Sequence, residues 1–147
     1  NVPQFNPNHY GAFSQKIRKN NIVASSYEPG SIFKPIVAAA ALDKELARPN
    51  DIYFCENGKL KIGNANIGEA SGHKFGWMTM NDIIAKSSNI GVIKIAQQVG
   101  KKPFYEYIRK FGFGEKTGLS LPGESPGQLK EQKKMVQPVS SFYFFWS

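Results

Sequence analysis

The chain has 147 residues, of which 41% are hydrophobic and 20% charged, and this composition indicates one globular domain rather than a disordered segment. Its net charge of +8 suits a nucleic-acid partner, but the lysines are scattered and form no basic stripe with interleaved aromatic residues, so we expect no nucleic acid. No apolar run reaches the roughly 18 residues that span a membrane, and no signal peptide opens the chain.

The first half of the chain predicts one buried helix and one hairpin. Residues 1–21 are rich in Asn, Pro and Lys and predict a strand end followed by a loop. Residues 31–45 carry apolar side chains on nearly every side, which predicts a buried helix. Residues 51–63 predict a hairpin around the two-residue turn Asn57-Gly58.

The second half predicts three helices. Residues 64–77 form a glycine-rich loop, after which Thr79 to Asp82 resembles a capping box and opens a short helix that runs to about Lys86. Further helices are predicted over residues 90–99 and 103–111, with turns over 114–127.

Cysteine and histidine indicate no metal site. Cys55 is the only cysteine, which excludes an intrachain disulfide and a thiolate-rich metal site. Its apolar neighbours predict a buried side chain. His9 and His73 stand at no metal-ligand spacing from another ligand.

Ser31 and Lys34 carry the first chemical signal, because residues three apart at the start of a helix lie on one face. A serine hydroxyl is a poor nucleophile until a base takes its proton. A lysine can act as that base when burial and neighbouring cations hold its amine neutral. Ser31 is therefore a candidate nucleophile and Lys34 its candidate base.

Ser87, Ser88 and Asn89 interrupt two predicted helices, so their side chains can face a cleft. A hydroxyl can relay a proton, and an amide can hold a substrate carbonyl and contact a lysine. The alternative reading of this segment is a plain loop between helices.

Longer blocks around these residues resemble class B penicillin-binding proteins. Residues 27–35 (YEPGSIFKP) resemble the active-site signature of that family. Residues 73–79 with 86–91 (HKFGWMT and KSSNIG) resemble its second block, and residues 111–124 (FGFGEKTGLSLPGE) its third. Their order and spacing fit the septal or elongation transpeptidases of peptidoglycan synthesis, and the style of the second and third blocks leans septal.

The resemblance implies an α+β fold of the serine β-lactamase/transpeptidase type, an antiparallel sheet flanked by helices, here lacking the C-terminal strands. It also implies a D,D-transpeptidase in which Ser31 attacks the D-Ala-D-Ala end of a stem peptide and the acyl-serine then passes to a neighbouring stem peptide. By the same resemblance Lys34 is the base, Ser87 the proton relay, and Ser87 and Asn89 bind substrate. β-Lactams acylate the same serine, and no cofactor or metal is implied.

The resemblance further implies a setting for the parent protein. It would work at the extracytoplasmic face of the bacterial inner membrane, with an anchor outside this chain and with membrane proteins of cell division or elongation as partners. The alternatives within the superfamily are a serine β-lactamase or D,D-carboxypeptidase and a non-catalytic β-lactam-binding sensor.

One element of the family is replaced here by a look-alike. The family places a Lys-Thr/Ser-Gly-Thr/Ser element on the edge strand that faces the serine. Lys116-Thr117-Gly118 resembles it but lies among turn residues, and Leu119 follows where a hydroxyl is needed. We expect the true element downstream of this chain, and therefore weak or no acylation and poor solubility for the chain by itself.

Residues 1–127 thus predict the N-terminal portion of a transpeptidase domain, and residues 128–147 an aberrant tail. Lys133-Lys134-Met135 can be encoded by a run of A followed by TGG. Deleting one A gives Lys-Lys-Trp, as in the family, and the shifted frame turns residues 143–147 toward the family's Ile/Thr-Ser-Phe-Gly.

We therefore predict that one extra A has shifted the reading frame. Resequencing the gene across the codons for residues 133–135 is expected to find a run of A. A frame that encodes Met135 without an A-tract would contradict this prediction.

Overall fold

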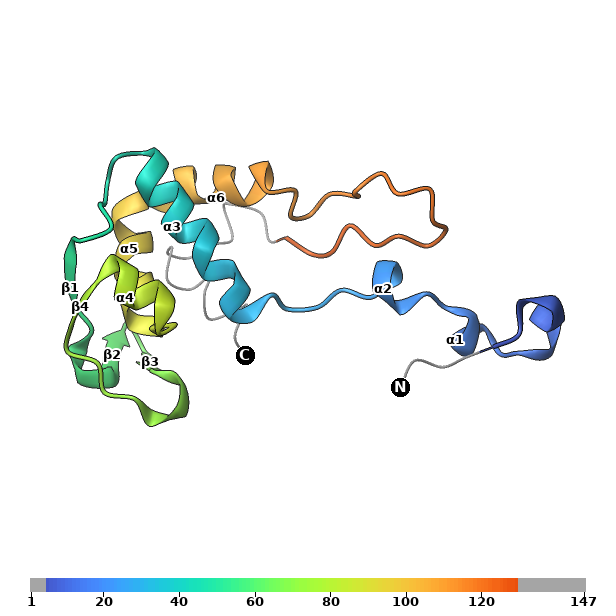
Figure 1. Ribbon diagram of the computed structural model, residues 1–147, viewed down its shortest axis with the longest axis horizontal. Helices are drawn as coiled ribbons and strands as arrows, with labels where there is room; N and C mark the ends of the chain where they lie inside the picture. The colour runs from blue at the N-terminus through green and yellow to red at the C-terminus, as the bar shows by residue number, and fades with distance from the viewer. Residues whose placement is uncertain (1–4, 130–147) are drawn as a thin grey trace. The chain divides into compact units, whose positions relative to one another are not determined.

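A computed structural model describes residues 5–129, and these residues form two compact units (Figure 1). The first unit comprises the described residues up to Tyr27 together with Gly112–Leu129, and the second comprises Glu28–Phe111. In neither unit does any helix within residues 5–129 have the length and apolar character needed to cross a membrane. All the candidate site residues fall in the second unit.

The first unit contains three short helical segments, η1 (Pro7–Ala12), α1 (Gln15–Arg18) and α2 (Asn21–Ala24). The strand end and loop predicted for residues 1–21 are therefore wrong over the described part of that range. The reason is local, because the Asn6 and Asn20 side chains accept the backbone N–H groups of the residues two positions on and so begin helical turns. Gly112–Leu129 holds no helix or strand, which confirms the turns predicted for 114–127.

Four α-helices and a short 3₁₀ segment organise the second unit, and they confirm the predicted helices to within a few residues. The 3₁₀ segment η2 (Gly30–Phe33) runs directly into α3 (Lys34–Asp43). The others are α4 (Met80–Ala85), α5 (Asn89–Val99) and α6 (Lys101–Lys110). Pro35 lies in the first turn of α3, where its missing N–H has no helical acceptor to lose.

The core of this unit lies where α3 packs on α5 and α6 (Figure 1). The rings of Phe33 and Phe104 meet edge to face with centroids 5.8 Å apart. The core also contains these buried apolar residues: Val37, Ala40, Ala41, Ile83, Ile90, Ile93, Ile95, Ala96 and Ile108. Because this packing fixes α3 against α5, it also fixes the polar groups at the starts of both helices.

The strands do not form the hairpin predicted for residues 51–63. β1 (Ile52–Phe54) pairs antiparallel with β4 (Trp77–Thr79), and β2 (Lys59–Ile62) pairs with β3 (Ala65–Gly68). The Asn57-Gly58 turn signal instead marks a 3₁₀ turn between β1 and β2. Long-range contacts decide the pairing: the Phe54 ring packs on Trp77, and the absence of a Cβ on Gly58 leaves space for the His73 backbone.

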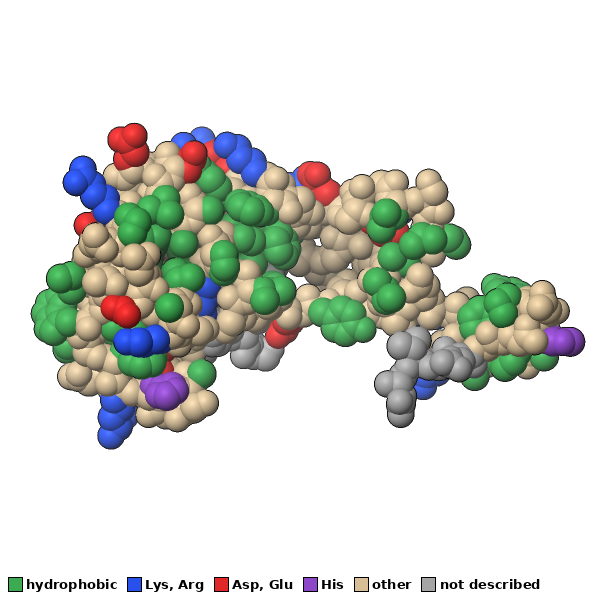
Figure 2. Space-filling view, viewed as in Figure 1, with side chains coloured by type: hydrophobic (Ala, Val, Ile, Leu, Met, Phe, Trp, Pro, Cys, Tyr) green, Lys and Arg blue, Asp and Glu red, His purple; other side chains and the backbone are tan. Residues whose placement is uncertain are grey.

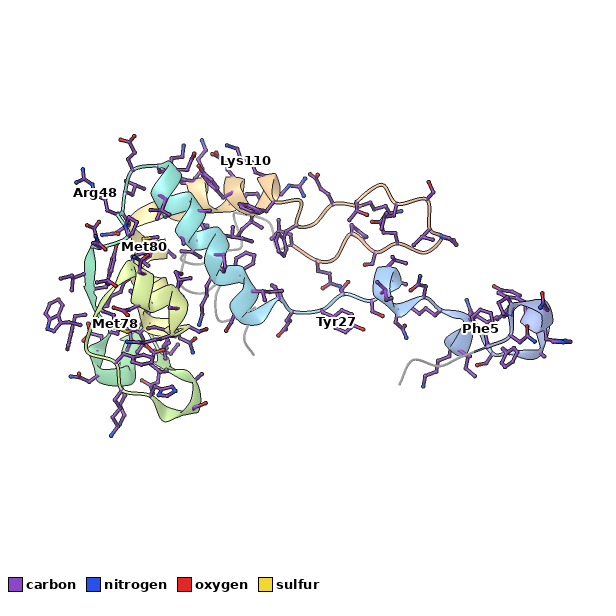
Figure 3. The ribbon with its side chains drawn as sticks, viewed as in Figure 1. Phe5, Tyr27, Arg48, Met78, Met80 and Lys110 are labelled. Carbon is purple, nitrogen blue, oxygen red and sulfur yellow. The ribbon has the colours of Figure 1, made fainter. Side chains whose placement is uncertain are left out.

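The β1–β4 pair has one face in the core and one in solvent. Met78 and Met80 are buried on the side of α4, where Figure 3 labels them. Ile52 and Trp77 are 63% and 73% exposed, and Figure 2 shows hydrophobic side chains gathered over this edge. The segment of residues 64–77, predicted as a glycine-rich loop, contains β3 and the 3₁₀ turn η4 (Ala70–Gly72) before β4 begins.

The packing of α4 on α5 depends on the missing side chain of Gly91. A Cβ at this position would lie 2.5 Å from Cγ1 of the buried Ile83, so we predict that Gly91→Ala lowers the free energy of unfolding by about 1–3 kcal/mol. Urea or thermal unfolding measures this. Gly68→Ala is the matched control, because its Cβ would meet its nearest atom at 3.9 Å and we expect little change. Equal stability of the two variants would contradict the predicted close packing.

Candidate active site

The candidate site lies where the first turn of α3 meets the turn before α5. Ser31 stands on η2 with an exposed side chain, and Lys34 is the first residue of α3, with only 2% of its surface exposed. Gly30 has a φ of 54°, a left-handed backbone that favours glycine and turns the chain into the helix. Helical spacing then places Ser31 and Lys34 on one face, as predicted.

The amine of Lys34 joins the two sequence motifs. Its Nζ donates to the carbonyl oxygen of Ser87, to Ser87 Oγ at 2.7 Å and to Asn89 Oδ1 at 2.8 Å. An ammonium has three protons, and these three oxygens can each accept one of them. Residues more than fifty positions apart in the sequence are thus held together by one buried cation.

Ser87 also reaches the candidate nucleophile. Its Oγ accepts from Lys34 Nζ and donates to Ser31 Oγ at 3.2 Å, so hydrogen bonds connect Lys34, Ser87 and Ser31 in that order. Ser87 has a φ of 57°, a left-handed conformation that non-glycine residues seldom adopt. Strain of this kind is often found at functional sites, and here it aims the Ser87 side chain between the other two. When the Lys34 amine is neutral, both hydroxyl hydrogen bonds can reverse, and the same contacts can carry a proton from Ser31 to Lys34.

Burial lowers the pKa of Lys34 from 10.5 to about 8, while the negative charge of Glu69 acts in the opposite direction. A lysine whose pKa lies near neutral pH has a substantial fraction of free amine, which is the form that can accept a proton. Burial is the larger of the two effects, so the site favours a base at this position.

Glu69 holds the turn before α5 through hydrogen bonds to Ser88, Asn89 and Ile90. This role was not predicted from the sequence. The Glu69 carboxylate accepts a hydrogen bond from Ser88 Oγ at 2.6 Å, from the Asn89 backbone N–H at 2.6 Å and from the Ile90 N–H at 3.4 Å. The first N–H groups of a helix lack helical acceptors and attract negative charge, which explains this position. Glu69 lies in the loop after β3, and only the folded chain brings it to α5.

Ser88 and Asn89 have separate structural partners. Ser88 caps α5 by accepting the Gly91 N–H at 2.9 Å, and its hydroxyl lies 3.6 Å from Cys55 Sγ. Cys55 is fully buried, as predicted, and burial raises the pKa of its thiol. Asn89 Nδ2 donates to the Gly68 carbonyl at 3.0 Å, which orients its Oδ1 toward Lys34. Ser88 is therefore part of the scaffold, whereas Ser87 and Asn89 contact Lys34.

The look-alike motif Lys116-Thr117-Gly118 does not lie on a strand. It lies in the first unit, in a stretch without regular structure, where the Thr117 hydroxyl and backbone N–H donate to the Glu124 carboxylate. The segment therefore lies outside any strand, as predicted. Over residues 5–129, no cluster of three or more His, Cys, Asp or Glu side chains could hold a metal ion.

Comparison with known proteins identifies the relatives of this chain. The sequence profile of the penicillin binding protein transpeptidase domain matches residues 1–144. Over 110 residues the chain is 40% identical to penicillin-binding protein PbpB of Mycolicibacterium smegmatis, which covers 75% of this chain and 17% of that protein. Over 134 residues it is 34% identical to the probable peptidoglycan D,D-transpeptidase PbpC of Pseudomonas aeruginosa, covering 91% of this chain and 23% of that protein.

Solved structures share the fold. The transpeptidase domain of penicillin-binding protein 3 from Burkholderia pseudomallei matches with a TM-score of 0.79 at 30% identity, covering 86% of this chain and 38% of that one. Penicillin binding protein 3 from Mycobacterium tuberculosis matches with a TM-score of 0.71 at 35% identity, over 78% of this chain and 26% of that one. The expected α+β transpeptidase fold is confirmed. The chain spans about a fifth of the length of the two curated relatives. The boundary at residue 127 and the shifted frame stay predictions.

The geometry around Lys34 predicts its protonation. In a chain with ¹³C-labelled lysine, we expect the Lys34 side-chain resonance to titrate with a midpoint of about 8. Lys34→Arg assigns the resonance, because that signal alone should disappear. A midpoint at the ordinary value of 10.5 would show that the amine is not held in the buried position described here.

Proposed function

The chain belongs to the penicillin-binding protein transpeptidase family, and on that premise we propose that it carries the nucleophile half of a peptidoglycan D,D-transpeptidase site, with Ser31 as the acylated residue. The observation that carries the proposal is the hydrogen-bond chain from Ser31 through Ser87 to the buried Lys34 amine. A nucleophile, a relay and a base of lowered pKa within hydrogen-bond reach are what activation of a serine requires.

The proposed acylation follows that chain. As Ser31 Oγ attacks the penultimate D-Ala carbonyl of a stem peptide, its proton moves to Ser87 Oγ, and the Ser87 proton moves to the neutral Lys34 amine. The tetrahedral adduct then expels the terminal D-Ala, whose amine takes the proton that Lys34 holds. The product is an ester between Ser31 and the shortened stem peptide.

Deacylation reverses the roles. The amino group of a neighbouring stem peptide attacks the ester and gives a proton to Lys34 through Ser87. As the ester bond breaks, this proton returns through Ser87 to the departing Ser31 Oγ. The result is a cross-link between two stem peptides. With a β-lactam the leaving group stays attached to the acyl-enzyme, so the ester at Ser31 persists.

Asn89 and Ser87 have a second proposed task in binding substrate. The Asn89 side chain is held by the Gly68 carbonyl and by Lys34, and we propose that it also contacts the amide of an incoming stem peptide. Holding both Lys34 and the substrate with the same amide would couple substrate binding to the position of the base.

We further propose that this chain alone is acylated weakly or not at all. Within residues 5–129 the strands are two short pairs, and none carries a Lys-Thr-Gly element. A stem peptide would then lack a partner for its carboxylate. Within the described residues each of the two strand pairs has unpaired edges, and we propose that these favour poor solubility.

The setting of the reaction is also a proposal. Relatives of this chain bear the names of peptidoglycan D,D-transpeptidases, including FtsI of Buchnera aphidicola, to which it is 34% identical over 150 residues. We propose that the parent protein acts on peptidoglycan at the extracytoplasmic face of the inner membrane, together with membrane proteins of cell division.

Fluorescent penicillin tests the nucleophile. Joined after residue 127 to the C-terminal part of the transpeptidase domain of its relative PbpB, the chain is expected to be labelled stoichiometrically, and Ser31→Ala is expected to abolish the label. Ser71→Ala, which removes another exposed serine of the same unit, should leave labelling intact.

Three outcomes would contradict these proposals. Labelling that persists in Ser31→Ala would show that another residue is acylated. Clean stoichiometric labelling of residues 1–147 without the added segment would show that the chain needs no further part of the domain. Turnover of the β-lactam, rather than a lasting adduct, would indicate a hydrolase instead of a transpeptidase.

A further inference from the structure

Behind the proposed catalytic residues, Glu69 is the carboxylate that joins the loop after β3 to the start of α5. Each of its two oxygens accepts hydrogen bonds. Oε1 accepts from Ser88 Oγ and the Ile90 N–H, and Oε2 accepts from the Asn89 N–H. One residue earlier, the Gly68 carbonyl accepts the Asn89 side chain. Two consecutive residues of one loop therefore hold both the backbone and the side chain of Asn89.

We propose that Glu69 is a positioning residue of the acylation site, whose carboxylate holds the Ser87–Asn89 turn against Lys34 and whose negative charge acts on the Lys34 amine across that turn. The inference rests on the proposed function, because it assigns Glu69 a part in keeping the base in place. Glu69 touches neither Ser31 nor Lys34 in the hydrogen bonds described, so it acts through the turn.

Fixing the turn matters because Ser87 holds a strained backbone. A left-handed serine persists only where its surroundings hold it there. On the C-terminal side, Ser88 and Asn89 are bonded to Glu69. On the N-terminal side, the Ser87 N–H bonds the Ile84 carbonyl and the Ser88 N–H bonds the Ile83 carbonyl of α4. The turn is thus held at both ends, and Glu69 supplies one of them.

The charge of Glu69 has an effect of its own on Lys34. Its field raises the pKa of Lys34 against the larger lowering by burial. Two lysines on helices packed against α3 are engaged elsewhere: Lys94 of α5 pairs with Glu56, and Lys86 of α4 pairs with Asp82.

Two further titratable groups of this unit also have partners. Tyr107 of α6 donates to Asp43 at the end of α3, and the Cys55 thiol contacts Ser88. Neutralising Glu69 should therefore change the protonation of Lys34 in a way that loss of another carboxylate would not.

Two substitutions separate charge from shape. Glu69→Gln keeps the length of the side chain but removes its charge, and its –NH₂ cannot accept from Ser88 or Asn89. Glu69→Asp keeps the charge but is one methylene shorter. Glu56→Gln is the matched control, because it removes a carboxylate of the same unit that pairs with Lys94.

The experiment follows the Lys34 side-chain ¹³C resonance of the whole chain by NMR as a function of pH. We expect the Lys34 midpoint to fall by about one pH unit in Glu69→Gln, to stay near the unsubstituted value in Glu69→Asp, and to stay unchanged in Glu56→Gln. An unchanged midpoint in Glu69→Gln, or an equal fall in Glu56→Gln, would overturn the proposal. A cap with a purely structural role would not move this midpoint while the fold is kept.

Hydrogen exchange in the unsubstituted chain keeps the proposal testable if Glu69→Gln does not fold. The Asn89 and Ile90 N–H groups have no helical acceptor, so their protection from exchange reports Glu69 directly. Slow exchange at both supports the proposal, and rapid exchange at both overturns it. Neither measurement requires acylation, so failure of Ser31 as the nucleophile and failure of Glu69 as a positioning residue give different results.

Discussion

The arrangement of this site depends on the burial of one amine. Lys34 is almost entirely removed from solvent, and an ammonium in such a place is tolerated only when oxygen acceptors surround it. The turn before α5 supplies them: one backbone carbonyl, one hydroxyl and one amide oxygen. Because the apolar packing of α3 on α5 brings the two helix starts together, the core and the polar site support each other. The same burial that makes the ammonium costly also lowers the pKa of Lys34 to about 8, which suits the proposed role of its amine as a base.

The remaining contacts keep that turn in one conformation. The left-handed Ser87 aims its hydroxyl between Lys34 and Ser31, and Asn89 is held by Gly68 on one side and Lys34 on the other. Glu69 holds the other side of the turn by accepting hydrogen bonds from the first N–H groups of α5. The strained backbone of Ser87 and the desolvated amine of Lys34 each cost folding free energy, which the packing of the apolar core offsets.

Much of this could be predicted from sequence because the signals are local. The apolar pattern of residues 31–45 and the Thr79 cap predict helices that the structure confirms, and spacing alone places Ser31 and Lys34 on one face. The predicted hairpin was wrong because Asn57-Gly58 describes only a turn, whereas the strand partner of Phe54 is chosen by Trp77, more than twenty residues away. Glu69 was missed for the same reason: nothing in its own loop distinguishes it, and its meaning comes from α5. The chemical roles proposed for Ser31, Lys34, Ser87 and Asn89 were inferred from the motif blocks, and the comparisons confirm the family that those blocks resemble.

Lys34 thus organises one part of the proposed acylation site, on a chain that spans about a fifth of the length of its curated relatives. A double-mutant cycle on the free energy of unfolding, using Lys34→Met, Asn89→Ala and the double variant, tests the central claim most directly. If the buried amine joins the two helix starts, the effects of the single substitutions should fail to add by about 1–3 kcal/mol. Additive effects would contradict the claim, because they would show that Lys34 and Asn89 do not depend on each other in the folded chain.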